Sequence, residues 1–146
     1  MDDTALMRLA LRQAAMDENE VPVGAVIALD GRVIAAAHNE QVSRNDALAH
    51  AEVLAIHRAQ ESLGQARLTD CTLYVTLEPC PMCAGALILA GVKRCVYAAF
   101  DSRYGCCGSV YALPMDPAFH HRVLCEGGLL MQEARALLDN FFAARR

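Results

Sequence analysis

Residues 72–100, TLYVTLEPCPMCAGALILAGVKRCVYAAF, contain the succession of elements that decides the fold. The run 72–77 is apolar and β-rich, which predicts a strand, and the prolines that follow it end the strand. Residues 82–90 predict a helix that Gly91 stops, and residues 94–100 predict a second strand. Strands that alternate with helices are typical of an α/β protein.

The flanking sequence extends this pattern on both sides. Apolar residues at helical spacing predict an amphipathic helix over residues 3–17. Asp30-Gly31 between two apolar runs predicts a β-hairpin. The other predicted elements are strands at 23–29, 32–37 and 122–125, helices at 49–63 and 129–144, and loops at 38–48 and 101–121. This order predicts an α/β fold with a five-stranded mixed sheet and helices on both faces.

Length and composition indicate one folded domain over residues 1–146. The chain is 55% hydrophobic and 21% charged, which excludes a disordered protein. No apolar run reaches the roughly 18 residues of a membrane span. Met1-Asp2-Asp3 is acidic and does not resemble the start of a signal peptide. We therefore expect a soluble, cytoplasmic protein that does not enter membranes.

Charge and cysteine content narrow the function classes further. The net charge is −4, so any contact with nucleic acid must use a local basic patch. The chain has seven cysteines, an odd number, and its sequence shows no export signal. Both observations argue against a disulfide framework. Cys71, Cys95 and Cys125 lie in or beside apolar strands and are predicted to be core residues. Cys106 and Cys107, in a loop, are interpreted either as small filler or as a pair that tunes the site or oxidises.

Two short motifs carry the candidate chemistry. Cys80 and Cys83 are three residues apart at a predicted helix start, so both sulfurs lie on one side of the helix. The free N–H groups of a helix start lower the pKa of a thiol, which prepares it to bind metal. His50 would supply a third ligand, and three ligands leave one zinc position for water. Glu52 could lie beside the metal without binding it and move protons.

The spacing H-x-E followed by P-C-x-x-C is the signature of zinc nucleobase deaminases. Either motif alone is weaker evidence for a zinc site, since a C-x-x-C pair can also be a redox centre or occur by chance. Together they predict one catalytic zinc ion per subunit.

The chain also resembles the bacterial tRNA-specific adenosine deaminases over nearly its whole length. The resemblance implies a three-layer α/β/α cytidine deaminase-like fold and hydrolytic deamination of the wobble adenosine of a tRNA anticodon stem-loop to inosine. It also implies a homodimer in which each tRNA site draws on both subunits. The matching segments are 21–26, Asn39, 46–52, 72–80, the loop from Asp101 to Ser109, 121–123, 137–142 and Arg145-Arg146.

Roles follow from the resemblance position by position. His50, Cys80 and Cys83 would hold zinc, and Glu52 would shuttle protons. The implied substrate contacts are Asn39 to the flipped base, Val23 and Ala51 along the base pocket, Asp101 near the target ribose, and His121, Arg145 and Arg146 near RNA phosphates or anticodon bases. The two C-terminal arginines fit a solvated helix end equally well.

Three functions remain open from the sequence. The first is a tRNA adenosine deaminase, and the second is a deaminase of a free base or nucleoside such as guanine or cytosine, which shares every catalytic residue. The third is a zinc-stabilised binding module without activity. Glu52 argues against this third reading, because a structural zinc site needs no acid that is not a ligand.

Overall fold

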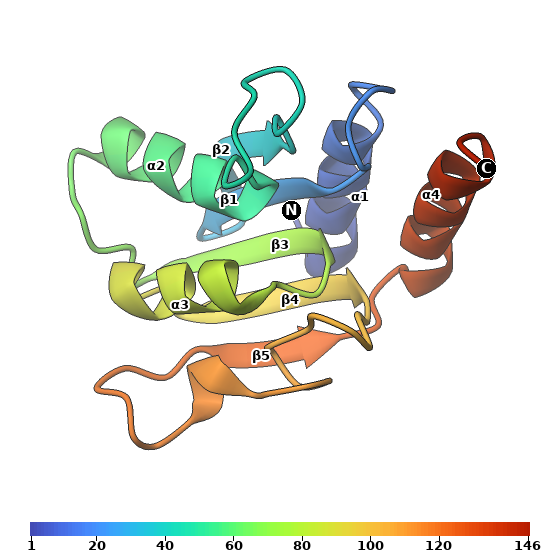
Figure 1. Cartoon of the computed structure of the whole chain (residues 1–146). Coiled ribbons are helices and arrows are strands. Elements are labelled where there is room, and N and C mark those ends of the chain that lie inside the picture. The colour runs from blue at the N-terminus through green and yellow to red at the C-terminus, as the bar shows by residue number, and fades with distance from the viewer.

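A computed structural model describes residues 1–146 as a three-layer α/β/α protein (Figure 1). A five-stranded sheet in the order β2-β1-β3-β4-β5 forms the middle layer. Helices α2 and α3 cover one face and α1 and α4 the other. The elements are α1 (Asp3–Ala14), β1 (Gly24–Leu29), β2 (Arg32–His38), α2 (Ala51–Leu63), β3 (Cys71–Leu77), α3 (Pro81–Ala90), β4 (Arg94–Ala99), a 3-10 turn η1 (Leu113–Met115), β5 (Leu124–Gly127) and α4 (Met131–Ala143).

The sheet is mixed, as the sequence predicted. Strand β1 pairs antiparallel with β2 and with β3, whereas β3, β4 and β5 run parallel to one another. The β1–β2 hairpin turns at Asp30 and Gly31, whose φ angles of 51° and 74° lie in the left-handed region. A two-residue turn with both φ angles positive matches the twist of a hairpin, which is why Asp-Gly is a strong turn signal.

Alternating side chains of the central strands fill two separate cores. Ile27, Leu73 and Cys95 point to the α2/α3 side, and Val26, Tyr74 and their neighbours point to the α1/α4 side. Because successive strand residues face opposite ways, a strand buried on both faces reads as one continuous apolar run. This explains the unbroken hydrophobicity of β1, β3 and β4.

Helices α2 and α3 each begin and end at a residue whose conformation marks the helix boundary. Gly64 and Gly91 cap the C-terminal ends of α2 and α3 in the left-handed conformation, with φ of 65° and 70°. At the other ends, His50 is the N-cap of α2 and Cys80 the N-cap of α3. The fold thus brings two helix starts, separated by 30 residues, to one place.

The boundaries correct the sequence prediction in small ways. Helix α1 ends at Ala14 and not near residue 17, because the following residues form turns in which Asp17 accepts from the backbone of Asn19. Strand β5 is shifted by two residues, since the N–H of Val123 donates to Pro114 of η1 and not to the sheet. No helix is both long and apolar enough to cross a membrane.

Candidate active site

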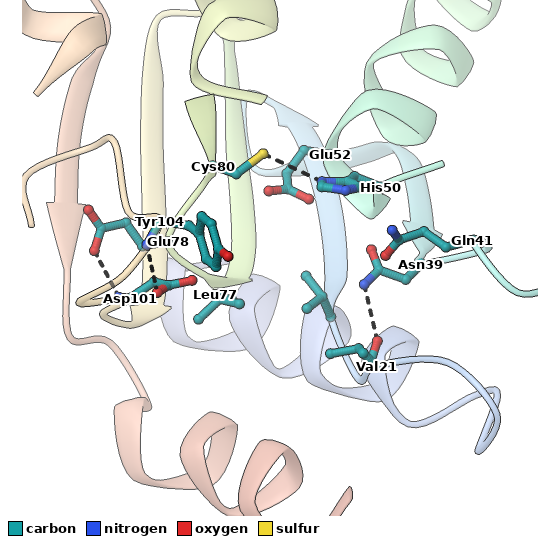
Figure 2. Close-up of a pocket in the computed structure, with 11 residues that line it drawn as sticks. Val21, Asn39, Gln41, His50, Glu52, Leu77, Glu78, Cys80, Asp101 and Tyr104 are labelled. Carbon is teal, nitrogen blue, oxygen red and sulfur yellow. Dashed lines mark hydrogen bonds between the residues drawn. The ribbon is translucent and has the colours of Figure 1, made fainter. Parts of the chain in front are cut away.

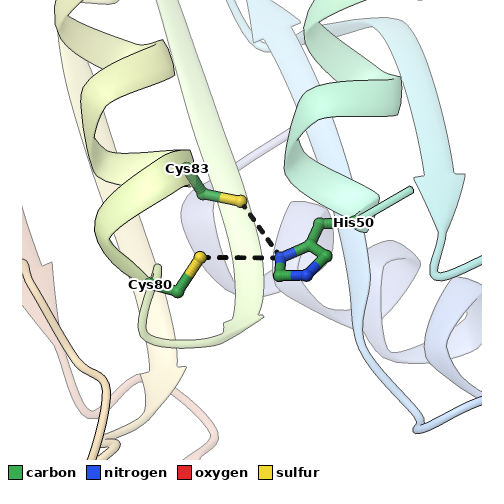
Figure 3. Close-up of side chains that lie close together, drawn as sticks. All are labelled: His50, Cys80 and Cys83. Atoms are coloured by element: carbon green, nitrogen blue, oxygen red, sulfur yellow. Dashed lines mark hydrogen bonds between the residues drawn. The ribbon is translucent and has the colours of Figure 1, made fainter. Parts of the chain in front are cut away.

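His50, Cys80 and Cys83 meet between the starts of α2 and α3 (Figure 3). The Nδ1 atom of His50 lies 3.6 Å from the sulfur of Cys80 and 3.4 Å from that of Cys83. All three ligand atoms lie within 4.8 Å of one another. This group could hold a metal ion, as the motif spacing predicted.

The cysteine pair owes its geometry to the start of α3. Cys80 is the N-cap, Pro81 occupies the first helical position, and Cys83 follows one turn on. Proline fits there because the N–H it lacks would have no partner inside the helix. A hydrogen bond from the thiol of Cys83 to the sulfur of Cys80 lowers the pKa of Cys80 to about 4, and the same hydrogen bond raises the pKa of Cys83. One thiolate therefore forms readily at the helix start, where the helix dipole favours negative charge.

Glu52 lies beside these ligands without belonging to the group. It is only 4% exposed, and burial raises the pKa of its carboxyl to about 7. A carboxyl with a pKa near the working pH can both accept and release a proton. The position fits the general acid and base that the sequence predicted.

His50, Glu52 and Cys80 line a pocket of about 400 Å³, which is within the size range of small-ligand sites. Figure 2 shows Asn39 and Gln41 across the pocket from Glu78 and Asp101, with His50, Glu52 and Cys80 between the two sides. The other lining residues are Val21, Val23, Leu77 and Tyr104.

Asn39 lines the pocket and is also tied into the fold. Its side-chain oxygen accepts from the backbone N–H of Ala51 at 2.9 Å, and its amide nitrogen donates to the carbonyl of Val21 at 3.2 Å. The N–H of Ala51 is one of the free donors at the start of α2, so Asn39, directly after the end of β2, caps this helix from outside it. The methyl group of Ala51 itself is fully buried and is not among the lining groups.

Asp101 begins the loop that forms the other side of the pocket. One of its carboxylate oxygens accepts from the backbone N–H groups of Arg103 and Tyr104, both at 3.0 Å. This is the pattern of an aspartate that stabilises a turn. Asp101 therefore lines the pocket and also shapes the loop; the contact with the target ribose that the resemblance implies stays a prediction.

Three predicted substrate residues lie outside the pocket. His121 bonds through Nε2 to the carbonyl of Val92. The Arg145 guanidinium donates to the carbonyls of Glu18 and Phe141 and stacks on the Phe141 ring at 3.5 Å. Arg146 is exposed at the end of the chain.

Sequence reasoning gave no role to Glu78 and Tyr104. Glu78 is 2% exposed and lines the pocket, and Tyr104 is 60% exposed at the same place. A signal for Glu78 was present, because a charged residue directly after an apolar strand and before Pro79-Cys80 needs hydrogen-bond partners once it is buried. Cys106 and Cys107 are both buried in the α2/α3 core.

Fold and site together place the chain among the cytidine deaminase-like enzymes, in which an α/β/α sheet presents a His/Cys/Cys ligand set and a free glutamate to a base-sized pocket. It belongs to the MafB19-like deaminase family, whose sequence model matches residues 1–145. The protein is a deaminase, and the family resemblance seen in the sequence is confirmed.

Relatives support this assignment along the whole chain. It is 42% identical over 146 residues to a tRNA-specific adenosine deaminase of Bacillus subtilis, covering 99% of this chain and 91% of that protein. A structure solved in a study of A-to-I editing by tRNA:A34 deaminases is 44% identical, with a TM-score of 0.87 over 92% of this chain and 99% of that one. A guanine deaminase from Nitrosomonas europaea is 27% identical, with a TM-score of 0.84 over 97% of this chain and 85% of that one.

Proposed function

We propose that this protein hydrolyses the wobble adenosine of a tRNA anticodon to inosine in a zinc-dependent reaction. One observation carries the proposal: His50, Cys80 and Glu52 line one pocket, with Cys83 grouped beside His50 and Cys80, in a chain that aligns end to end with tRNA adenosine deaminases. tRNA is a cytoplasmic substrate in bacteria, which supports a cytoplasmic enzyme.

Zinc fits both the donor types and the spacing of the ligand group. Zn–S bonds of about 2.3 Å and Zn–N bonds of about 2.0–2.1 Å at a tetrahedral angle place nitrogen and sulfur ligands roughly 3.6 Å apart. The two nitrogen–sulfur distances of 3.6 and 3.4 Å agree with this value. Bound zinc would lower the pKa of the attacking water toward neutrality.

Glu52 would carry the protons of the reaction. As a carboxylate it accepts a proton from the attacking water and delivers it to a ring nitrogen of adenine. It then takes the proton of the hydroxyl group that water has added to C6 and passes it to the amino group, so that the C6–N bond breaks, ammonia leaves and C6 becomes a carbonyl. A carboxyl with a pKa of about 7 suits both transfers at neutral pH.

The pocket walls would hold the base that has left its stack. Val23 offers an apolar surface, and the second amide hydrogen of Asn39 can donate to the purine edge. Asp101 would face the ribose from the opposite wall. His121, Arg145 and Arg146 would act on the RNA outside the pocket, although the bonds of His121 and Arg145 within the protein also give these two a structural role.

A homodimer is supported by the surface of α3. This helix is apolar on its outer side as well as its inner one, and its outer stripe consists of Met82, Gly85 and Leu89. Leu89 is 74% exposed, and a methyl group placed on Gly85 would meet no neighbouring atom. A second copy packed on this stripe would remove it from water. Leu89→Glu should then convert a dimer to a monomer in sedimentation velocity.

The direct test is incubation with a transcribed anticodon stem-loop that has adenosine at the wobble position, followed by sequencing for inosine. Free guanine, adenine and cytosine are assayed in parallel, because the guanine deaminase neighbour shares the fold. Turnover of guanine with none of the stem-loop would replace the tRNA proposal with a base deaminase. Metal analysis should give about one zinc per chain, and Cys83→Ala should lose it.

A further inference from the structure

Glu78 is a buried carboxylate without a charged partner. It is 2% exposed, and no lysine or arginine forms an ion pair with it. Its backbone N–H donates to the carbonyl of Ala99, so the sheet holds the main chain of this residue independently of the side chain. A buried charge of this kind is stable only when hydrogen bonds replace its water.

All of those hydrogen bonds come from the loop over residues 101–109. One carboxylate oxygen accepts from the N–H of Asp101 at 3.0 Å and from the hydroxyl of Ser109. The other accepts from the N–H groups of Cys107 and Ser109, at 3.1 and 2.9 Å. Four donors spread over nine residues therefore converge on one side chain, and the loop wraps around it.

Gly105 shows that the loop packs tightly against the Glu78 side chain. A Cβ atom on Gly105 would lie closer than van der Waals contact to the carboxyl group of Glu78. Only glycine allows the loop to approach this far. The same loop carries Asp101 and Tyr104 to the pocket wall, opposite Asn39 (Figure 2).

We propose that Glu78 is the positioning residue that holds the 101–109 loop against the pocket, so that Asp101 and Tyr104 stand ready for the nucleotide around the target base. This inference rests on the proposed function for the identity of its substrate, a nucleotide within an RNA loop. Glu78 acts through the loop and takes no part in proton transfer.

Glu78→Gln tests the arrangement because an amide cannot serve four donors. If its NH2 group replaces the oxygen near Cys107, two backbone N–H groups lose their acceptor. If it replaces the other oxygen, the Ser109 hydroxyl can turn and accept, but the N–H of Asp101 still loses its acceptor. A lost bond to a charged acceptor should raise the open fraction of the loop by about 10- to 100-fold.

Trypsin reports this opening without any substrate, because Arg103 lies in the exposed middle of the loop. Cleavage that is slow relative to reclosing follows the open population. We expect the rate of cleavage after Arg103, measured by mass spectrometry, to rise at least tenfold in Glu78→Gln. Gly105→Ala should give the same result from the loop side, and it carries the test if Glu78→Gln does not fold.

Glu20→Gln is the matched control. Glu20 is also buried, at 3% exposure; the N–H of Val42 is shared between its two oxygens, and one of these oxygens also accepts from the N–H of Ser43, so that it alone reaches both donors. A glutamine oxygen in that place can still serve both donors, so the same chemical change should leave cleavage at Arg44 and at Arg103 near the wild-type rates.

Kinetics separate positioning from general damage. For the stem-loop we expect KM to rise about tenfold in Glu78→Gln while kcat changes less than about threefold, with zinc content unchanged. Unchanged cleavage at Arg103 in both variants overturns the proposal, and so does a fall in kcat at constant KM. If the wild-type protein does not deaminate the stem-loop, the proposed function fails. Glu78 is then judged by Arg103 cleavage alone, where a rise supports the positioning role and no change refutes it.

Discussion

Asn39→Ala should disturb both the stability of the fold and the geometry of the site. The side chain is 6% exposed and supplies the acceptor, at 2.9 Å, for the N–H of Ala51, which lies between the proposed metal ligand His50 and the proposed proton carrier Glu52. Alanine leaves that buried N–H without a partner, which costs about 1–3 kcal/mol. For a domain of this size the loss should lower Tm by roughly 3–10 °C. A shift of α2 should also reduce stem-loop turnover on the order of 10²-fold.

Asn39→Asp separates the two contributions. Its carboxylate still accepts from Ala51, at a helix start where negative charge is favourable, but it no longer donates to the carbonyl of Val21 or to a base. We expect less than half of the Tm loss of Asn39→Ala and a comparable loss of turnover. Calorimetry and the inosine assay measure the two effects. If Asn39→Ala melts within about 1 °C of the wild type, or Asn39→Asp is equally destabilised, the capping argument is wrong.

Glu52→Ala should keep its zinc and lose about 10²–10⁴-fold in turnover, and retention of more than a tenth of the activity would remove Glu52 from the mechanism. The bond from Arg94, helped by Tyr74, holds the pKa of Asp3 below its ordinary value. A lowered folded pKa adds stability above the unfolded value of about 3.9, and this is lost as the pH falls through the folded pKa. Asp3→Asn should therefore lower Tm by a few degrees at most at pH 7, with a difference that shrinks below about pH 4; a constant difference across pH would contradict this. Replacing Arg145 and Arg146 together by alanine should weaken stem-loop binding in a salt-dependent way and affect free-base turnover less, whereas equal losses on both substrates would make the pair structural.

Much of the fold followed from local sequence rules. The sequence pattern identified every α-helix and strand, because the burial of a strand on two faces or of one helix stripe leaves a direct trace in the chain, whereas the short 3-10 helix η1 fell inside the predicted loop over residues 101–121. The Asp30-Gly31 turn and the glycines after α2 and α3 were also readable, since few residues adopt positive φ at low cost. Element ends were less accurate where a long-range bond decided them, as at Val123.

The ligand trio was equally accessible from the sequence. Cys80 and Cys83 share one helical turn, and His50 is two residues from a glutamate, so spacing alone indicated the chemistry. The resemblance added the substrate class. Spacing rules of this kind describe only the residues within a few positions of each motif.

Only the tertiary structure showed how the pocket is held in place. The donors to Glu78 lie 23 to 31 residues further along the chain, and Asn39 reaches Ala51 across 12 residues. It also showed that Arg145 is bonded to Glu18, 127 residues away, and not free in solution. Partners this distant leave no periodic trace, because a buried polar group requires only that some donor or acceptor reach it in the folded chain. The sequence therefore determined the chemistry of this protein, and the packing of its loops decided which polar side chains hold that chemistry in position.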